Sequence, residues 1–211
     1  MSRALSGVWW LLAFCGVLDA MHAGMNLLML DPSLTLRAFG LPNAVWDMGI
    51  LALATGICAI GAGLWSVGKD NSWLLSLHGL AMGAFGVIAV SPLVRGPISF
   101  RPVSLLFVVM AASIGAFALK TAQKQRPGAQ DRWFLIASGA TSIGFALSFV
   151  AVGFRLIRLE PPQAFFLWMS SYFVFCAVFM LWLGFRVRRR GLSPSDQMGS
   201  LSPLPNPRTA H

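Results

Sequence analysis

Six long apolar runs divide the chain, and short connectors rich in turn residues separate them. Each run has 17 to 23 residues, which is about the length that an α-helix needs to cross a bilayer. The runs are Val8–Leu30, Ala44–Ser66, Trp73–Ser91, Val103–Leu119, Trp133–Phe154 and Ala164–Phe185. This pattern predicts an all-α integral membrane protein, a bundle of six transmembrane helices.

The first run carries a stripe of polar residues that no other run has. Cys15, Asp19, His22 and Asn26 follow one another at spacings of four, three and four, which places them on one face of a helix. Ionisable groups in mid-bilayer are costly, and they are candidates for function by default. A carboxylate beside an imidazole can hold or pass a proton, but the same pair can also fasten helices together. The sequence leaves both interpretations open.

The odd-numbered runs repeat one another. Each contains a Trp that is followed six residues later by a Gly, in Trp10–Gly16, Trp73–Gly79 and Trp133–Gly139, and the register advances by 63 and then 60 residues. This spacing predicts three tandem helical hairpins, at roughly 8–66, 73–119 and 133–185, and a pseudo-threefold axis along the membrane normal.

The repeat shows where polar chemistry is concentrated. His78 and Ser138 occupy the position of Cys15. Met82 and Ser142 occupy the position of Asp19. The polar site is therefore a feature of the first hairpin, and His78 is the only obvious contribution from another one.

Small residues recur every three or four positions in several runs. Lipid gives helices no hydrophobic reason to associate, so close approach across small side chains supplies the dispersion contacts instead. The glycines expected to pack helices are Gly16, Gly49, Gly56, Gly63, Gly79, Gly83, Gly86 and Gly139. These stripes could hold one bundle together, or they could bind a second copy of the chain or a larger membrane complex.

Composition supports the membrane interpretation and adds an orientation. The 211 residues are 56% hydrophobic and 11% charged, with a mean hydropathy of +0.71. The net charge of +9 comes from residues that flank the apolar runs, an arrangement that argues against nucleic acid as a partner. Ten Lys and Arg residues fall at the ends shared with the N-terminus and five at the opposite ends, so both termini are expected to be cytoplasmic. The bilayer is then the main partner, and the domains are a membrane domain, 1–190, and a disordered cytoplasmic tail, 191–211.

No motif indicates enzymatic or cofactor chemistry. The three cysteines lie in separate apolar runs without metal-binding spacing, and nucleotide loops and nucleophile elbows are absent. His22 and His78 differ by seven positions in the repeat, about 10 Å in depth, too far to ligate one haem iron. We expect no catalytic residue, metal or cofactor.

The repeated Trp-Leu-Leu-x-x-x-Gly opening, together with Asp31-Pro32-Ser33-Leu34-Thr35-Leu36 after the first run, resembles the HdeD family of acid-resistance membrane proteins. The resemblance covers about residues 8 to 190. It implies a six-helix protein of the bacterial inner membrane that is associated with tolerance of acid stress. Family members often have Arg or Glu directly before the repeated Gly, where this chain has Cys15, His78 and Ser138. The roles of Asp19 and His22 therefore cannot be inferred from the family.

Three functions are compatible with these observations. The first is a non-enzymatic protein of the HdeD type that contributes to acid or envelope stress tolerance. The second is a proton-coupled small transporter or channel that uses Asp19, His22 and His78. The third is a packing subunit of a larger membrane complex. A polar cavity that reaches Asp19 from one face of the membrane would favour transport, whereas a closed core would favour the other two.

Overall fold

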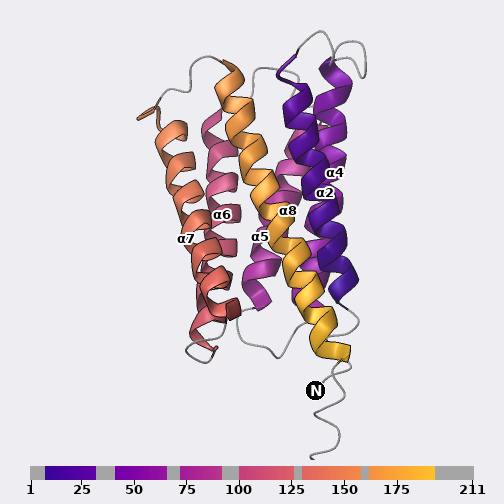
Figure 1. The fold of residues 1–211 in the computed structure, drawn as a ribbon. Helices are drawn as coiled ribbons and strands as arrows, with labels where there is room; N and C mark the ends of the chain where they lie inside the picture. The colour runs from indigo at the N-terminus through magenta and orange to yellow at the C-terminus, as the bar shows by residue number, and fades with distance from the viewer. Residues whose placement is uncertain are drawn as a thin grey trace, which may run out of the picture.

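All regular structure in the described part of the chain is α-helical (Figure 1). The computed structural model describes residues 8–31, 41–65, 72–91, 100–125, 130–157 and 162–192. Its helices are α2 Trp9–Leu28, α4 Leu41–Trp65, α5 Ser72–Val90, α6 Phe100–Gln123, α7 Gln130–Gly153 and α8 Pro162–Leu192. Six segments of 19 to 27 residues are long and apolar enough to span a membrane. The prediction of an all-α protein with six spans is therefore confirmed.

The helices form where the apolar runs are, because a chain segment inside lipid must satisfy its own backbone hydrogen bonds. Five helices begin and end within four residues of the predicted runs. The exception is α8, which continues to Leu192, whereas the last run was predicted to end at Phe185. The predicted tail thus begins inside this helix. Residues 193–211 and most of the connectors lie outside the described residues.

The helices pack side by side in a ring that follows the order of the chain. Contacts join α2 to α4, α4 to α5, α5 to α6 and α6 to α7, and α8 closes the ring against α2. In Figure 1, α8 runs obliquely across the front of the bundle. Its contacts with α7 are aromatic, between Phe149 and Trp168 at 4.4 Å and between Phe145 and Tyr172 at 5.3 Å. The closest helix pairs are α2 with α8, α4 with α5, and α6 with α7.

The backbones of α4 and α5 meet at glycines. A Cβ atom on Gly79 would lie 2.6 Å from the carbonyl oxygen of Gly56, and one on Gly56 would lie 2.7 Å from that of Gly79. No carbon atom fits at that distance, so the spacing of the two helices requires glycine at both positions. The same interface contains Gly49, Gly63 and Gly86.

Glycines also set the approach of the other two close pairs. A Cβ atom on Gly16 of α2 would lie 2.7 Å from Leu181 Cγ on α8, and one on Gly139 of α7 would lie 2.6 Å from Leu119 Cγ on α6. Gly83 differs from the other predicted packing glycines, because a Cβ atom there meets nothing within 4 Å. Gly83 takes part only through its backbone, which Gly56 approaches.

Aromatic side chains fill the centre of the bundle, and both aliphatic and aromatic side chains cover its outside. Phe107, Phe149 and Tyr172 are fully buried and contact one another edge to face or stacked. The outward-facing side chains are apolar, as expected for a surface in contact with lipid. Among the most exposed are Ile57, Leu80, Leu147 and Leu156.

The two glycines of the GxxxG sequence in α5 should respond differently to alanine. We expect Gly79→Ala to lower the free energy of unfolding by about 1 to 3 kcal/mol, because the new Cβ atom forces α4 and α5 apart. The matched change Gly83→Ala should be neutral or slightly stabilising, because its Cβ atom enters open space and alanine favours helices. Unfolding in detergent micelles measures both. Equal losses in the two variants would contradict the assigned interface.

Candidate functional site

The polar stripe of α2 lies entirely inside the bundle. Cys15, Asp19, His22 and Asn26 are exposed by 3% or less, and they face α4 on one side and α8 on the other. The helical spacing of the sequence thus places all four side chains on the buried face. Their polar atoms must find partners within the protein, because neither lipid nor water reaches them.

His22 is held by two backbone carbonyl groups. Its Nδ1 atom lies 3.0 Å from the oxygen of Leu18 in its own helix, and its Nε2 atom lies 3.1 Å from the oxygen of Met48 in α4. The ring also stacks on Phe173 of α8 at 4.8 Å. A neutral imidazole carries one N–H and can donate to one of these carbonyls, whereas an imidazolium can donate to both. The two nitrogen atoms of His22 are thus engaged with backbone oxygens and not with the carboxyl group of Asp19.

Asp19 has a polar neighbourhood on α8 that the sequence did not suggest. Its side chain is 1% exposed, and its Oδ2 atom has no hydrogen-bond partner. The carboxyl group interacts electrostatically with the thiols of Cys15 and Cys176 and with the phenol of Tyr172. Asp19 is therefore the acidic centre of a buried cluster shared by α2 and α8.

Tyr172 and Cys176 are the members of this cluster that sequence reasoning missed. They are one helical turn apart on α8, and both are buried. The Tyr172 hydroxyl lies beside the Cys176 thiol without an aligned hydrogen bond. One signal could have found the pair, since Tyr172 is the only tyrosine in the chain and lies in the middle of the last span.

His78 contributes a second buried imidazole from α5. Its Nδ1 atom lies 3.2 Å from the carbonyl oxygen of Met110 on α6, whereas its Nε2 atom has no partner. The ring is 1% exposed. Both nitrogens of His22 lie against carbonyl oxygens. His22 and His78 are therefore not arranged to ligate one haem iron together. Within the described residues, no group of three His, Cys, Asp or Glu side chains is arranged to hold a metal ion.

Cys15 and Asn26, at the two ends of the stripe, make structural contacts. The thiol of Cys15 donates to the carbonyl oxygen of Thr55 on α4 at 3.7 Å and lies beside the thiol of Cys58. The amide of Asn26 donates to the carbonyl oxygen of His22 at 2.9 Å. The hydrogen bonds of these two residues are thus accounted for, whereas Asp19, His78 and Tyr172 each have a buried polar atom without a partner.

Two buried serines connect neighbouring helices of the bundle. Ser170 of α8 donates to the carbonyl oxygen of Ala23 at 3.0 Å, and Ser142 of α7 donates to that of Ala111 at 2.7 Å. Such bonds fasten membrane helices at about 0.6 kcal/mol each. Serine in an apolar run gives little sequence signal, because the same residue is also a small packing side chain.

The arrangement can hold a proton, and its polar side chains are buried among the described helices. A protonated Asp19 could donate to a neighbouring thiol or phenol, and an ionised Asp19 would lack the hydrogen bonds that a buried charge requires. The two surface grooves that the structure describes are lined by other residues. Neither of these two grooves therefore reaches the buried polar centre.

Comparison with known proteins found no relative. No family model matches the chain, and searches of curated proteins and of solved structures gave no match.

Replacing Asp19 with leucine, which has the same branching at Cγ, should stabilise the protein. We expect Asp19→Leu to raise the free energy of unfolding by about 1 to 3 kcal/mol, because it removes a buried polar atom that has no partner. The control Asn26→Leu, on the same face of α2, should lower it by about 0.6 kcal/mol, because it removes a hydrogen bond. Unfolding of the wild type and the two variants in detergent micelles measures both changes in free energy. If Asp19→Leu lowers the free energy of unfolding more than Asn26→Leu does, the carboxyl group must have hydrogen-bond partners in the folded protein.

Proposed function

We propose that this chain is a non-enzymatic inner-membrane protein of the HdeD type that contributes to tolerance of acid or envelope stress in a bacterium. The repeated Trp-Leu-Leu-x-x-x-Gly opening and the six spans support this proposal. The observation that carries it is the burial of the ionisable side chains. Asp19, His22 and His78 are each exposed by 1% or less, and ionisable groups buried in this way suit a protein that must not leak protons.

We also propose that a pseudo-threefold axis relates the three repeats. The repeated glycines of α2, α5 and α7 support it, because each of them packs against the helix that precedes its own helix around the ring. These preceding helices are α8, α4 and α6. Each contacts two residues spaced by four on that helix: Gly16 contacts Ala177 and Leu181, Gly79 contacts Gly56 and Ile60, and Gly139 contacts Gly115 and Leu119. Equivalent contacts at equivalent positions are what such an axis would produce.

Proton flux and acid survival together test the proposed function. We expect purified protein in liposomes to leave proton flux across a pH gradient at the level of empty liposomes, for the wild type and for Asp19→Asn alike. Bacterial cells that produce the protein should survive acid shock better than cells with an empty vector. Equal survival would contradict the stress function. Flux above that of empty liposomes would contradict the expectation that the protein does not leak protons.

A proton relay is the second candidate, and the unpartnered polar atoms favour it. Asp19 Oδ2 and His78 Nε2 are buried without hydrogen bonds, and His22 lies between two carbonyl acceptors. Buried groups left unsatisfied in this way are costly, and proteins often keep them where a proton is bound or passed. Wild-type flux that Asp19→Asn abolishes would establish this function.

We propose that both termini face the cytoplasm, as the distribution of Lys and Arg residues suggests. Two exposed positions at opposite ends of the bundle test this. In intact cells, a thiol reagent that does not cross membranes should label Leu156→Cys but not Gln123→Cys. The native cysteines should give little background, because Cys15 and Cys176 are buried and Cys58, which is partly exposed, lies within an apolar span that the reagent does not enter. Labelling of Gln123→Cys alone would reverse the orientation.

A further inference from the structure

A groove of about 390 Å³ lies between the ends of α7 and α8. Asp131, Trp182, Phe185, Arg186 and Arg189 line it. None of these residues belongs to the buried polar cluster, so the groove requires its own explanation.

Arg186 is fixed in place at the groove. Its Nη2 atom lies 3.0 Å from Oδ2 of Asp131 on α7, and its side chain is only 10% exposed. Its guanidinium group lies over the ring of Trp182 at 5.1 Å, and that ring packs on Phe134 of α7 at 4.3 Å. A guanidinium held by a carboxylate and an aromatic face loses little freedom when it binds a further group.

Arg189 gives the groove its net charge. It lies three residues after Arg186, so both side chains are on the same face of α8, and its own side chain is exposed. Asp131 offsets one of the two positive charges, which leaves the groove with a net charge of about +1. Its wall combines this cationic edge with the apolar rings of Trp182 and Phe185.

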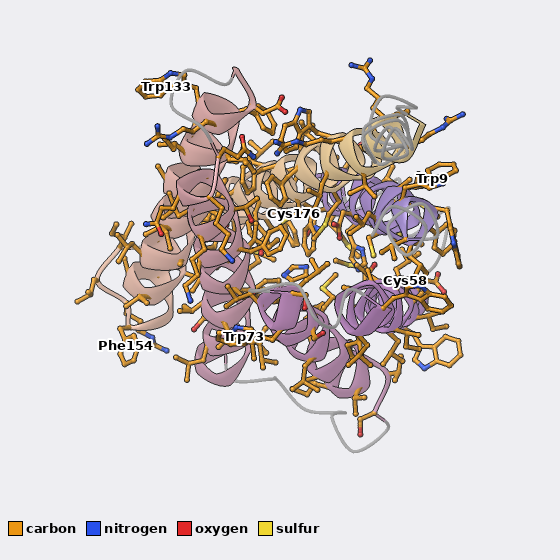
Figure 2. The ribbon with its side chains drawn as sticks, turned by 90° about the horizontal axis from the view of Figure 1, so that it is seen from below. Trp9, Cys58, Trp73, Trp133, Phe154 and Cys176 are labelled. Carbon is orange, nitrogen blue, oxygen red and sulfur yellow. The ribbon has the colours of Figure 1, made fainter. Side chains whose placement is uncertain are left out.

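The groove lies at the level of a membrane interface. The same end of the bundle contains exposed tryptophans, including Trp73 and Trp133, and Figure 2 shows Trp133 on the periphery. Lys120 lies 5.7 Å from the ring of Trp73 at that end. Tryptophan and basic residues together mark the depth of the lipid headgroups.

We propose that this groove binds the headgroup of an acidic phospholipid. Arg189 contacts the phosphate, and the immobilised guanidinium of Arg186 holds the phosphate in position. Trp182 and Phe185 lie against the glycerol and the start of the acyl chains. A basic edge beside apolar rings at headgroup depth suits a lipid, which has both a phosphate and hydrocarbon. This inference is independent of the function of the polar cluster.

Arg188 provides a matched control for Arg189. The two are adjacent, and both are exposed, but Arg188 lies over the ring of Trp9 at 4.9 Å and does not line the groove. Arg188→Gln and Arg189→Gln therefore remove the same charge from the same end of α8, and only the second removes it from the proposed site.

Native mass spectrometry of the full chain in detergent tests the proposal by titration with a phosphatidylglycerol and, separately, a phosphatidylcholine. We expect the wild type to retain one phosphatidylglycerol in preference to phosphatidylcholine. Arg189→Gln should weaken this binding about fivefold, equivalent to about 1 kcal/mol. Arg188→Gln should change it less than twofold, and 10-fold excess inorganic phosphate should not displace the lipid.

Three results would overturn the proposal. Equal losses in the two variants would indicate diffuse attraction to basic charge and no site. Equal retention of phosphatidylcholine would indicate binding through acyl chains alone. Displacement by inorganic phosphate would indicate a site for a free anion. Thermal unfolding of both variants verifies that they remain folded, which we expect because both side chains are exposed.

Discussion

The contact between the backbones of α4 and α5 is the constraint on which the rest of the bundle depends. Hydrocarbon surrounds the helices, so their association must come from dispersion and hydrogen bonds over short distances. Glycines at positions 56 and 79 bring the two backbones so close that a single added methyl group would not fit. The pairs α2 with α8 and α6 with α7 follow the same rule at Gly16 and Gly139. Three close pairs then leave a central space, which the aromatic rings fill.

The position of the polar cluster follows from the way in which the ring closes. Because α8 packs against α2, Tyr172 and Cys176 come near Asp19, although more than 150 positions in the sequence separate them from it. On the other side of α2, α4 supplies the carbonyl groups of Met48 and Thr55. The stripe therefore lies between two neighbours that differ in character. One offers backbone acceptors, and the other offers an aromatic ring, a thiol and a phenol.

The sequence predicted the helices better than their contacts. Apolar length determines a span almost alone, so six spans could be located from the runs, and the spacing of Cys15, Asp19, His22 and Asn26 determined a shared face. The partners across that face depend on which helices are adjacent, and no local pattern encodes the closure of α8 against α2. Gly83 shows the same limit, since its spacing from Gly79 suggested packing but its Cβ position is open. For α8, the Arg residues after Phe185 were interpreted as the end of the span, yet charged side chains at the interface allow a helix to continue.

The buried polar side chains differ in whether their hydrogen bonds are completed. This difference separates residues with a structural role from Asp19. Ser142 and Ser170 each donate a hydrogen bond to a backbone carbonyl of another helix, and Asn26 donates one to a carbonyl of its own helix, so hydrogen bonding within the bundle explains all three. It does not explain Asp19, whose Oδ2 atom has no partner and whose position in the second repeat is occupied by methionine. An apolar residue would fill that site at lower cost, because burial of an unpaired polar atom costs about 1 to 3 kcal/mol. The carboxyl group of Asp19 is thus the one member of the stripe that packing alone does not account for.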